Sequence, residues 1–248
     1  MRKMIIAGNW KMHFTPPKAK EFVESMKKRL DTEKLDVVLC VPFVDLQSVM
    51  DELKGTHIKV GAQNMHYMDE GAYTGEISGA MLEDMGVPYV IIGHSERRER
   101  FGETDTTVNL KILKALEHNI IPIICVGESQ KQRNQDRTAR VLKKQLNFAL
   151  DDITAEQAGK IVIAYEPLWA IGTGVTATTK QAEEACSLIR NHIKEKYDNN
   201  TAEKTRILYG GSVTPDNAKE LFSMPDIDGG LVGGASVVVS FERVVHFE

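Results

Sequence analysis

The chain has 248 residues and a formal net charge of −4, with 42% hydrophobic and 27% charged residues. These values are ordinary for a soluble globular protein, and the charge balance disfavours nucleic acid or an anionic membrane as a general partner. Cys40, Cys125 and Cys186 lie far apart between apolar neighbours, so we expect reduced thiols and a cytoplasmic location. The apolar run near the start is too short for a signal peptide or a membrane span.

Short apolar runs alternate with amphipathic stretches along the whole chain. Strands are expected to begin near Met4, Val37, Ile58, Tyr89, Ile120, Ile161, Ile207 and Gly230. Each of the eight units averages about 31 residues, which is the size of a strand followed by a return helix. No linker or change of composition divides the chain, so residues 1–248 are predicted to form a single domain.

The stretches between these strands have the spacing of helices. One apolar face is formed by Phe22, Val23, Met26 and Leu30, and another by Ala182, Cys186, Ile189 and Ile193. Thr178 and Gln181 have the spacing of a capping box, and Pro215 is expected at the first position of a later helix. Eight alternating units allow a closed (β/α)₈ barrel or an open doubly wound sheet. The count of eight and the absence of an exposed edge strand favour the barrel.

In such barrels the active groups gather at the carboxyl ends of the strands. Polar residues and glycines follow most of the predicted strands, in chain order Asn9 and Lys11, Gln63 and Asn64, His94, Glu128, Glu166, Gly210–Ser212, and Gly233 with Gly234. A purely structural barrel has no need for such a collection, so these residues indicate a functional site.

Glu166 is the most informative of these residues. It ends the apolar run Ile161–Tyr165, where a buried strand opens onto a loop, and this suits a general base. Pro167 stiffens the start of the loop, and Gly172 and Gly174 permit unusual backbone angles beyond it. The pattern predicts a base beside a closing lid, with hinges on both sides of these glycines at 167–169 and 175–177.

Six motifs together resemble the triosephosphate isomerase family, in order and over nearly the whole chain. They are Ala7–Met12, Gly93–Arg98, Ala164–Pro167, Ala170–Gly174, Tyr209–Val213 and Leu231–Ser236. The resemblance implies a TIM barrel, usually a homodimer, that interconverts dihydroxyacetone phosphate and glyceraldehyde 3-phosphate in glycolysis and gluconeogenesis. It implies no cofactor. The sequence contains no CxxC or HExxH motif, so a metal site is not expected.

The resemblance also implies roles for single residues. Glu166 would move a proton between neighbouring carbons, His94 would polarise the carbonyl, and Lys11 would hold positive charge beside the substrate oxygens. Asn9 would be a polar neighbour, while Glu96 and Cys125 would support the site from behind. The chemistry agrees, because a carboxylate is a weak base for a carbon acid and the developing enediolate needs donors and positive charge.

A phosphate site is expected where glycines follow the last two strands, at Ser212, Gly233 and Gly234, with Gly172 contributing from the lid. These segments contain no Lys or Arg, which leaves Lys11 as the main cation. The stretch Gly172–Ala177 fits a dinucleotide fingerprint, but it begins too far beyond the strand for that role.

The long loop Asn64–Glu76 is typical of a functional or interface loop. By the resemblance it would insert into a second subunit, with Tyr73, Thr74 and Gly75 at its tip. Two residues depart from the family pattern: Val175 replaces a common lysine at the lid, and His13 replaces a common asparagine near the subunit contact.

Two other functions are compatible with a barrel. A glycosidase would need a second carboxylate beside Glu166, whereas the seventh strand ends in glycines and aromatic residues make up only 6% of the chain. A catalytically silent phosphate-binding barrel would have no need for Glu166, His94 and Lys11 together.

Overall fold

A computed structural model describes residues 2–172 and 175–247, and these form a closed barrel of eight parallel strands. Each strand pairs with the next, and the last pairs back to the first, so the predicted (β/α)₈ barrel is confirmed and the open sheet is excluded. The strands are β1 (Ile5–Asn9), β2 (Asp36–Val41), β3 (Lys59–Ala62), β4 (Tyr89–Ile92), β5 (Ile121–Val126), β6 (Val162–Tyr165), β7 (Arg206–Tyr209) and β8 (Gly229–Val232).

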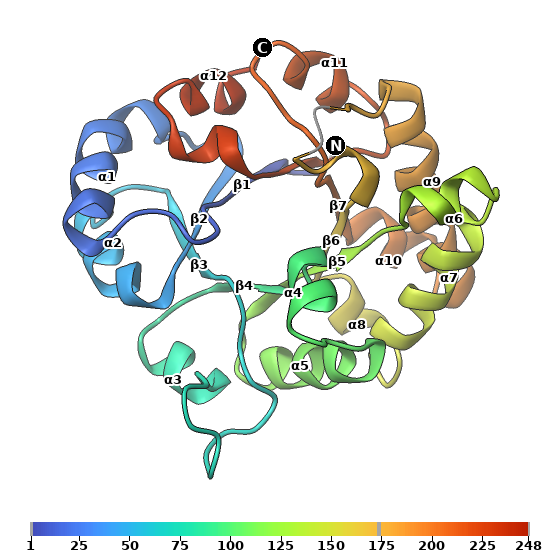
Figure 1. Cartoon of the computed structure of the whole chain (residues 1–248), viewed down its shortest axis with the longest axis horizontal. Coiled ribbons are helices and arrows are strands. Elements are labelled where there is room, and N and C mark those ends of the chain that lie inside the picture. The colour runs from blue at the N-terminus through green and yellow to red at the C-terminus, as the bar shows by residue number, and fades with distance from the viewer. Residues whose placement is uncertain (1, 173–174, 248) are drawn as a thin grey trace.

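Helices form a ring around the strands (Figure 1). They are α1 (Pro16–Leu30), α2 (Leu46–Glu52), α3 (Gly79–Asp84), α4 (Ser95–Arg100), α5 (Asp105–Glu117), α6 (Gln130–Asn134), α7 (Thr138–Ala149), α8 (Ala155–Ala158), α9 (Thr179–Lys196), α10 (Asn199–Lys204), α11 (Ala218–Phe222) and α12 (Phe241–Val245), with short 3₁₀ helices η1 (Phe43–Asp45), η2 (Leu168–Ala170) and η3 (Gly234–Val237). None of the helices in the described ranges is long and apolar enough to cross a membrane.

The start of α9 is as predicted, because Thr178 and Gln181 form a capping box there. The prediction for Pro215 is wrong. Residues 215–217 form a turn, and α11 begins only at Ala218. The side chain of Asn217 accepts a hydrogen bond from the N–H of Thr214 at 2.8 Å, and this closes the turn before the helix.

Side chains of the barrel strands alternate between two apolar layers, as the two faces of a buried parallel sheet require. Ile5 and Ala7 belong to the cluster inside the barrel, whereas Ile6 belongs to the larger cluster between strands and helices. The apolar faces predicted for α1 and α9 pack into this outer cluster. Gly229 begins β8 with φ +125°, and a Cβ there would overlap the carbonyl oxygen of Ile5, so only glycine lets β8 close against β1.

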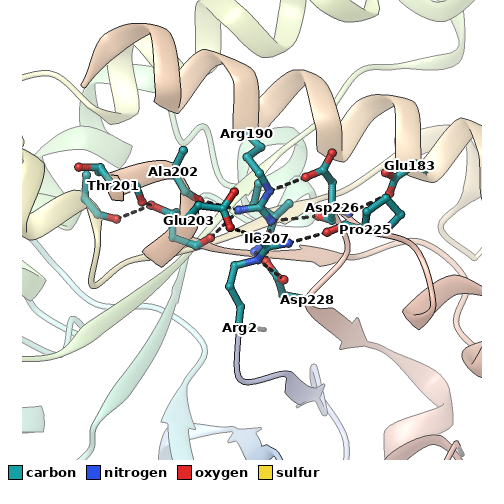
Figure 2. A network of polar contacts seen from close by, with 12 residues as sticks. Arg2, Glu183, Arg190, Thr201, Ala202, Glu203, Ile207, Pro225, Asp226 and Asp228 are labelled. Carbon is teal, nitrogen blue, oxygen red and sulfur yellow. Dashed lines mark hydrogen bonds and ion pairs between the residues drawn. The ribbon is translucent and has the colours of Figure 1, made fainter. Parts of the chain in front are cut away.

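An ionic network joins several elements at the amino ends of the last strands (Figure 2). Arg190 of α9 contacts Asp226 at 2.6 Å and Asp228 at 2.7 Å. Asp228 also accepts hydrogen bonds from Arg2 at 2.6 Å and from the backbone N–H of Ile207 at 2.8 Å. This network ties the first residues of the chain to α9, β7 and β8, at the end of the barrel opposite the site described next.

Candidate functional site

A cavity of about 280 Å³ lies at the carboxyl ends of the strands. It brings together most residues that the sequence predicts for the site, and its lining comprises Asn9, Lys11, His94, Glu166, Ile171, Gly172, Gly210, Gly211, Ser212, Val213, Thr214, Leu231, Gly233, Gly234 and Ala235. Segments from five strand ends therefore converge on one space, although they are far apart in sequence.

Glu166 follows β6 directly and is almost completely buried. Its Oε1 atom lies 2.8 Å from Nε2 of His94, and its Oε2 atom accepts a hydrogen bond from the backbone N–H of Ser95 at 2.9 Å. Ser95 is the first residue of α4, where backbone N–H groups have no partner within the helix. The carboxylate is thus held at a helix start by two donors.

His94 precedes α4 and caps it. Its Nδ1 atom accepts the backbone N–H of Glu96 at 3.3 Å, so the proton of a neutral ring lies on Nε2 and points to Glu166. Burial, the largest influence, lowers the pKa of His94, but the Glu166 and Glu96 carboxylates outweigh it and the pKa lies above its ordinary value. In this arrangement the imidazole is ready to donate from Nε2.

Lys11 follows β1 with φ +53°, an unfavourable backbone conformation for a residue with a side chain. The Nε2 amide of Gln63 donates to the carbonyl of Lys11 at 2.9 Å, and the Asn9 side chain accepts the Lys11 N–H at 3.0 Å. The Lys11 ammonium contacts the Glu96 carboxylate at 2.7 Å. Burial alone would raise the pKa of Glu96, but Lys11, with a smaller effect of His94, brings it below its ordinary value.

The glycines after β7 and β8 form the other wall of the cavity. A Cβ on Gly210 would lie 3.0 Å from Cγ of Glu166, and one on Gly233 would lie 3.5 Å from Cε of Lys11. Small residues therefore let the backbone approach both the carboxylate and the ammonium. Ser212 and Gly172 also line this cavity, whereas Thr173 and Gly174, central to the predicted lid, lie outside the described residues.

Cys125 and Glu128 lie near the site but do not line this cavity. The Cys125 thiol is completely buried beside Glu166, and burial raises its pKa well above the ordinary value. Glu128 follows β5 but does not line the cavity. It accepts hydrogen bonds from the Tyr165 hydroxyl and from Nε1 of Trp169, each at 3.0 Å, and so holds the start of the predicted lid.

Two contacts within the site are not predicted by the sequence. Ser95 contacts Glu166 through its backbone N–H, and its place directly after His94 at a helix start is the signal that could have revealed it. Gln63 holds the backbone of Lys11, a contact that sequence spacing does not reveal. Two arginines of α4 pair with carboxylates beyond the helix, Arg97 with Glu103 and Arg98 with Asp105.

The loop between β3 and α3 projects away from the ring of helices (Figure 1). Residues 68–76 are exposed, and Tyr73 packs against His66 with ring centroids 4.4 Å apart. A second cavity of about 280 Å³ adjoins the first, with Asn9, Lys11 and His94 lining both. The exposed side chains of Met12 and Phe101 line this second cavity, so apolar surface surrounds an opening next to Lys11.

Among residues 2–172 and 175–247, no three His, Cys, Asp or Glu side chains gather in a way that could hold a metal ion. The fold and the cavity define a (β/α)₈-barrel protein that presents a carboxylate, an imidazole and an ammonium group at the carboxyl ends of its strands.

Comparison with known proteins identifies the family. The family model described as triosephosphate isomerase matches residues 4–248. The chain is 56% identical to the triosephosphate isomerase of Acetivibrio thermocellus over 247 residues, covering 99% of this chain and 98% of that protein. It is 54% identical to that of Clostridium botulinum (strain Langeland) and 52% identical to that of Clostridium perfringens (strain 13), in each case over all of both chains. The chain belongs to the triosephosphate isomerase family, and the family resemblance of its motifs is confirmed.

Proposed function

We propose that this protein is an isomerase that interconverts dihydroxyacetone phosphate and D-glyceraldehyde 3-phosphate through an enediolate, without a cofactor. Family membership supports the reaction, and the observation that carries the assignment of residues is the pairing of Glu166 with His94 at 2.8 Å in the cavity that Lys11 also lines. Three chemically different groups thus surround a space large enough for a small phosphorylated sugar.

Glu166 is the proposed base. Its carboxylate takes a proton from the carbon next to the carbonyl, and the electron pair left behind forms the enediolate. The Nε2–H of His94 and the ammonium of Lys11 stabilise the charge that develops on the substrate oxygens. His94 passes the hydroxyl proton from one substrate oxygen to the other, and Glu166 returns the first proton to the neighbouring carbon, so the reaction consumes no other reactant. The bond between Glu166 and His94 is broken when substrate enters between them.

The phosphate is proposed to bind along the glycine wall. Gly233, Gly234 and Ser212 offer backbone groups and one hydroxyl, and Gly172 faces them from the loop after β6. No Lys or Arg besides Lys11 is among the lining residues in the described part of the chain. Closure of that loop would exclude water and slow the loss of phosphate from the enediolate.

We infer a homodimer in which residues 68–76 of each chain enter the second cavity of the other. The projecting loop and an apolar cavity beside Lys11 support this arrangement, because the cavity would otherwise expose Met12 and Phe101 to water. Lys11 then has its conformation fixed from the partner's side as well. The three buried, free cysteines are in keeping with a cytoplasmic location.

The competing functions have less support. Glu166 is the one carboxylate among the described residues that line the cavity at the glycine wall, whereas a glycosidase needs a pair. A silent barrel has no use for a buried carboxylate held against an imidazole, and close similarity to proteins named as isomerases disfavours it.

A coupled assay of the purified protein tests the proposal. Each triose phosphate is supplied in turn, with a metal chelator present, and the other is measured with a dehydrogenase that consumes it. We expect turnover in both directions that is unaffected by the chelator. Binding of a triose phosphate with no turnover would instead identify a silent barrel.

A further inference from the structure

The chain segments that follow β5 and β6 run side by side at the proposed base, Glu166. The N–H of Glu166 donates to the carbonyl of Val126 at 2.7 Å, and the N–H of Leu168 donates to the carbonyl of Glu128 at 3.1 Å. Gly127 lies between these two bonds, so close that a Cβ would overlap the carbonyl oxygen of Glu166. The backbone of Glu166 therefore rests directly on the backbone of Gly127, and a shift of one moves the other.

Gln145 of α7 holds Gly127 at both of its polar backbone groups. The Oε1 atom of Gln145 accepts the Gly127 N–H at 2.8 Å, and its Nε2 donates to the Gly127 carbonyl at 3.1 Å. A side-chain amide carries one acceptor and one donor on adjacent atoms, and only this orientation satisfies both contacts. Buried Gly127 thus has its hydrogen bonds completed by one side chain rather than by the barrel.

No packed side chain takes over the role of these two hydrogen bonds. A cavity of about 260 Å³ lies behind the base, and Gln145 and Glu166 both line it, together with Cys125 and Gly127. The residues that line this cavity have no packed side chains on the side that faces it. The position of Gly127 on this side therefore depends on the two hydrogen bonds from Gln145.

We propose that Gln145 is a positioning residue for the reaction, which sets the place of the Glu166 carboxylate through Gly127. The inference rests on the proposed role of Glu166 as the base. It assigns Gln145 no contact with substrate. The consequence is specific: a side chain that cannot both accept and donate at Gly127 displaces the base and lowers turnover while substrate binding is kept.

Two substitutions test this in the full-length protein. Gln145→Met keeps the length of the side chain and removes both bonds. We expect kcat to fall about 10-fold to 10²-fold, the range for a misplaced catalytic group, with KM within about twofold of wild type. Gln145→Glu keeps the acceptor but, when ionised, sets a carboxylate against the Gly127 carbonyl. On protonation it regains a donor in the same place.

Gln145→Glu should show a pH dependence of kcat that a loss of stability does not produce. As pH falls from about 8 to about 5, towards the range where carboxyl groups protonate, the ratio of Gln145→Glu to wild-type kcat should rise. The ratio for Gln145→Met should stay flat. Asn147→Asp is the matched control, because it places the same charge on the exposed face of α7, and its kcat should equal that of wild type.

The outcomes separate the two proposals. If the wild type is active, two results refute the role of Gln145 alone. One is a kcat of Gln145→Glu equal to that of wild type at every pH, and the other is a low ratio of Gln145→Glu to wild-type kcat that does not rise as pH falls. This holds even where Gln145→Met fails to fold. A wild type without isomerase activity refutes the proposed function, and the positioning role with it.

Discussion

Oε1 of Glu166 lies 2.8 Å from Nε2 of His94, although the two residues follow β6 and β4, which are separated in the barrel by β5. Closure of the barrel places both strand ends around the same cavity, and this brings the two side chains together. This contact joins the Glu166 carboxylate to the His94 imidazole, so substrate has to break the contact when it binds. The resting position of the base and its working position are therefore different in the proposed reaction.

The proposed lid depends on Gly172. Its φ of +67° is forbidden to proline, which fixes φ near −65°. We expect Gly172→Pro to lower kcat about 10-fold to 10²-fold by misplacing the loop over the cavity, with the circular dichroism spectrum unchanged. Gly55→Pro is the matched control, because Gly55 also has positive φ and open surroundings but precedes β3 at the other end of the barrel. Equal kcat for both variants would argue against a lid.

Arg190 is predicted to support the closed barrel rather than the chemistry. It is buried between Asp226 and Asp228, so Arg190→Met leaves two carboxylates without this partner. Breaking a buried pair on one side costs about 3–5 kcal/mol of unfolding free energy, measurable by urea titration. Arg243→Met removes an exposed pair with Asp216 and should hardly move the midpoint. Similar unfolding midpoints for the two variants would contradict a stabilising role of Arg190 in the network of Figure 2.

His118 links the projecting loop to the barrel through two carboxylates. Its Nδ1 lies 2.7 Å from Glu83 of α3, and its Nε2 lies 2.7 Å from Asp69 of the loop, which Lys114 also contacts. A neutral ring has one N–H, so both contacts are hydrogen bonds only when the ring is charged. The hydrogen bond to Glu83 is the main cause that raises the pKa of His118 above its ordinary value.

The sign of the pH dependence follows from that direction. A raised folded-state pKa gives stability that is complete below the unfolded value of about 6.5 and is lost as pH rises through the folded value. The difference in unfolding midpoint between wild type and His118→Gln should therefore be largest near pH 6 and disappear at alkaline pH. A difference for His118→Gln that does not change with pH would exclude the charged link.

The proposed dimer can be tested on the loop itself. Tyr73 is 41% exposed in the single chain, and Tyr73→Glu would place a charge where the partner's apolar cavity is expected. We expect sedimentation at micromolar concentration to show mainly dimer for wild type and mainly monomer for this variant. Leu188→Glu, at a site on α9 that is 42% exposed, should leave the dimer intact. Monomeric wild type would remove the basis of the dimer proposal.

The sequence predicted the barrel well because its signals are local. Each strand begins within one residue of its predicted position, since buried parallel strands are short apolar runs bounded by polar residues. The convergence of Glu166, His94 and Lys11 followed from topology. Contacts that depend on side-chain reach did not: Gln63 reaches across to Lys11, and Glu128 turns towards Trp169 instead of the cavity.

The most direct measurement is kcat for Glu166→Asp in the coupled assay with glyceraldehyde 3-phosphate. The shorter side chain withdraws the carboxylate by about 1 Å, and a base whose position limits the reaction should then lose about 10²-fold in kcat while KM changes little. Such a loss, in a variant that unfolds at the wild-type temperature, is what the proposed role of Glu166 requires. A folded Glu166→Asp with wild-type kcat would show that another group moves the proton.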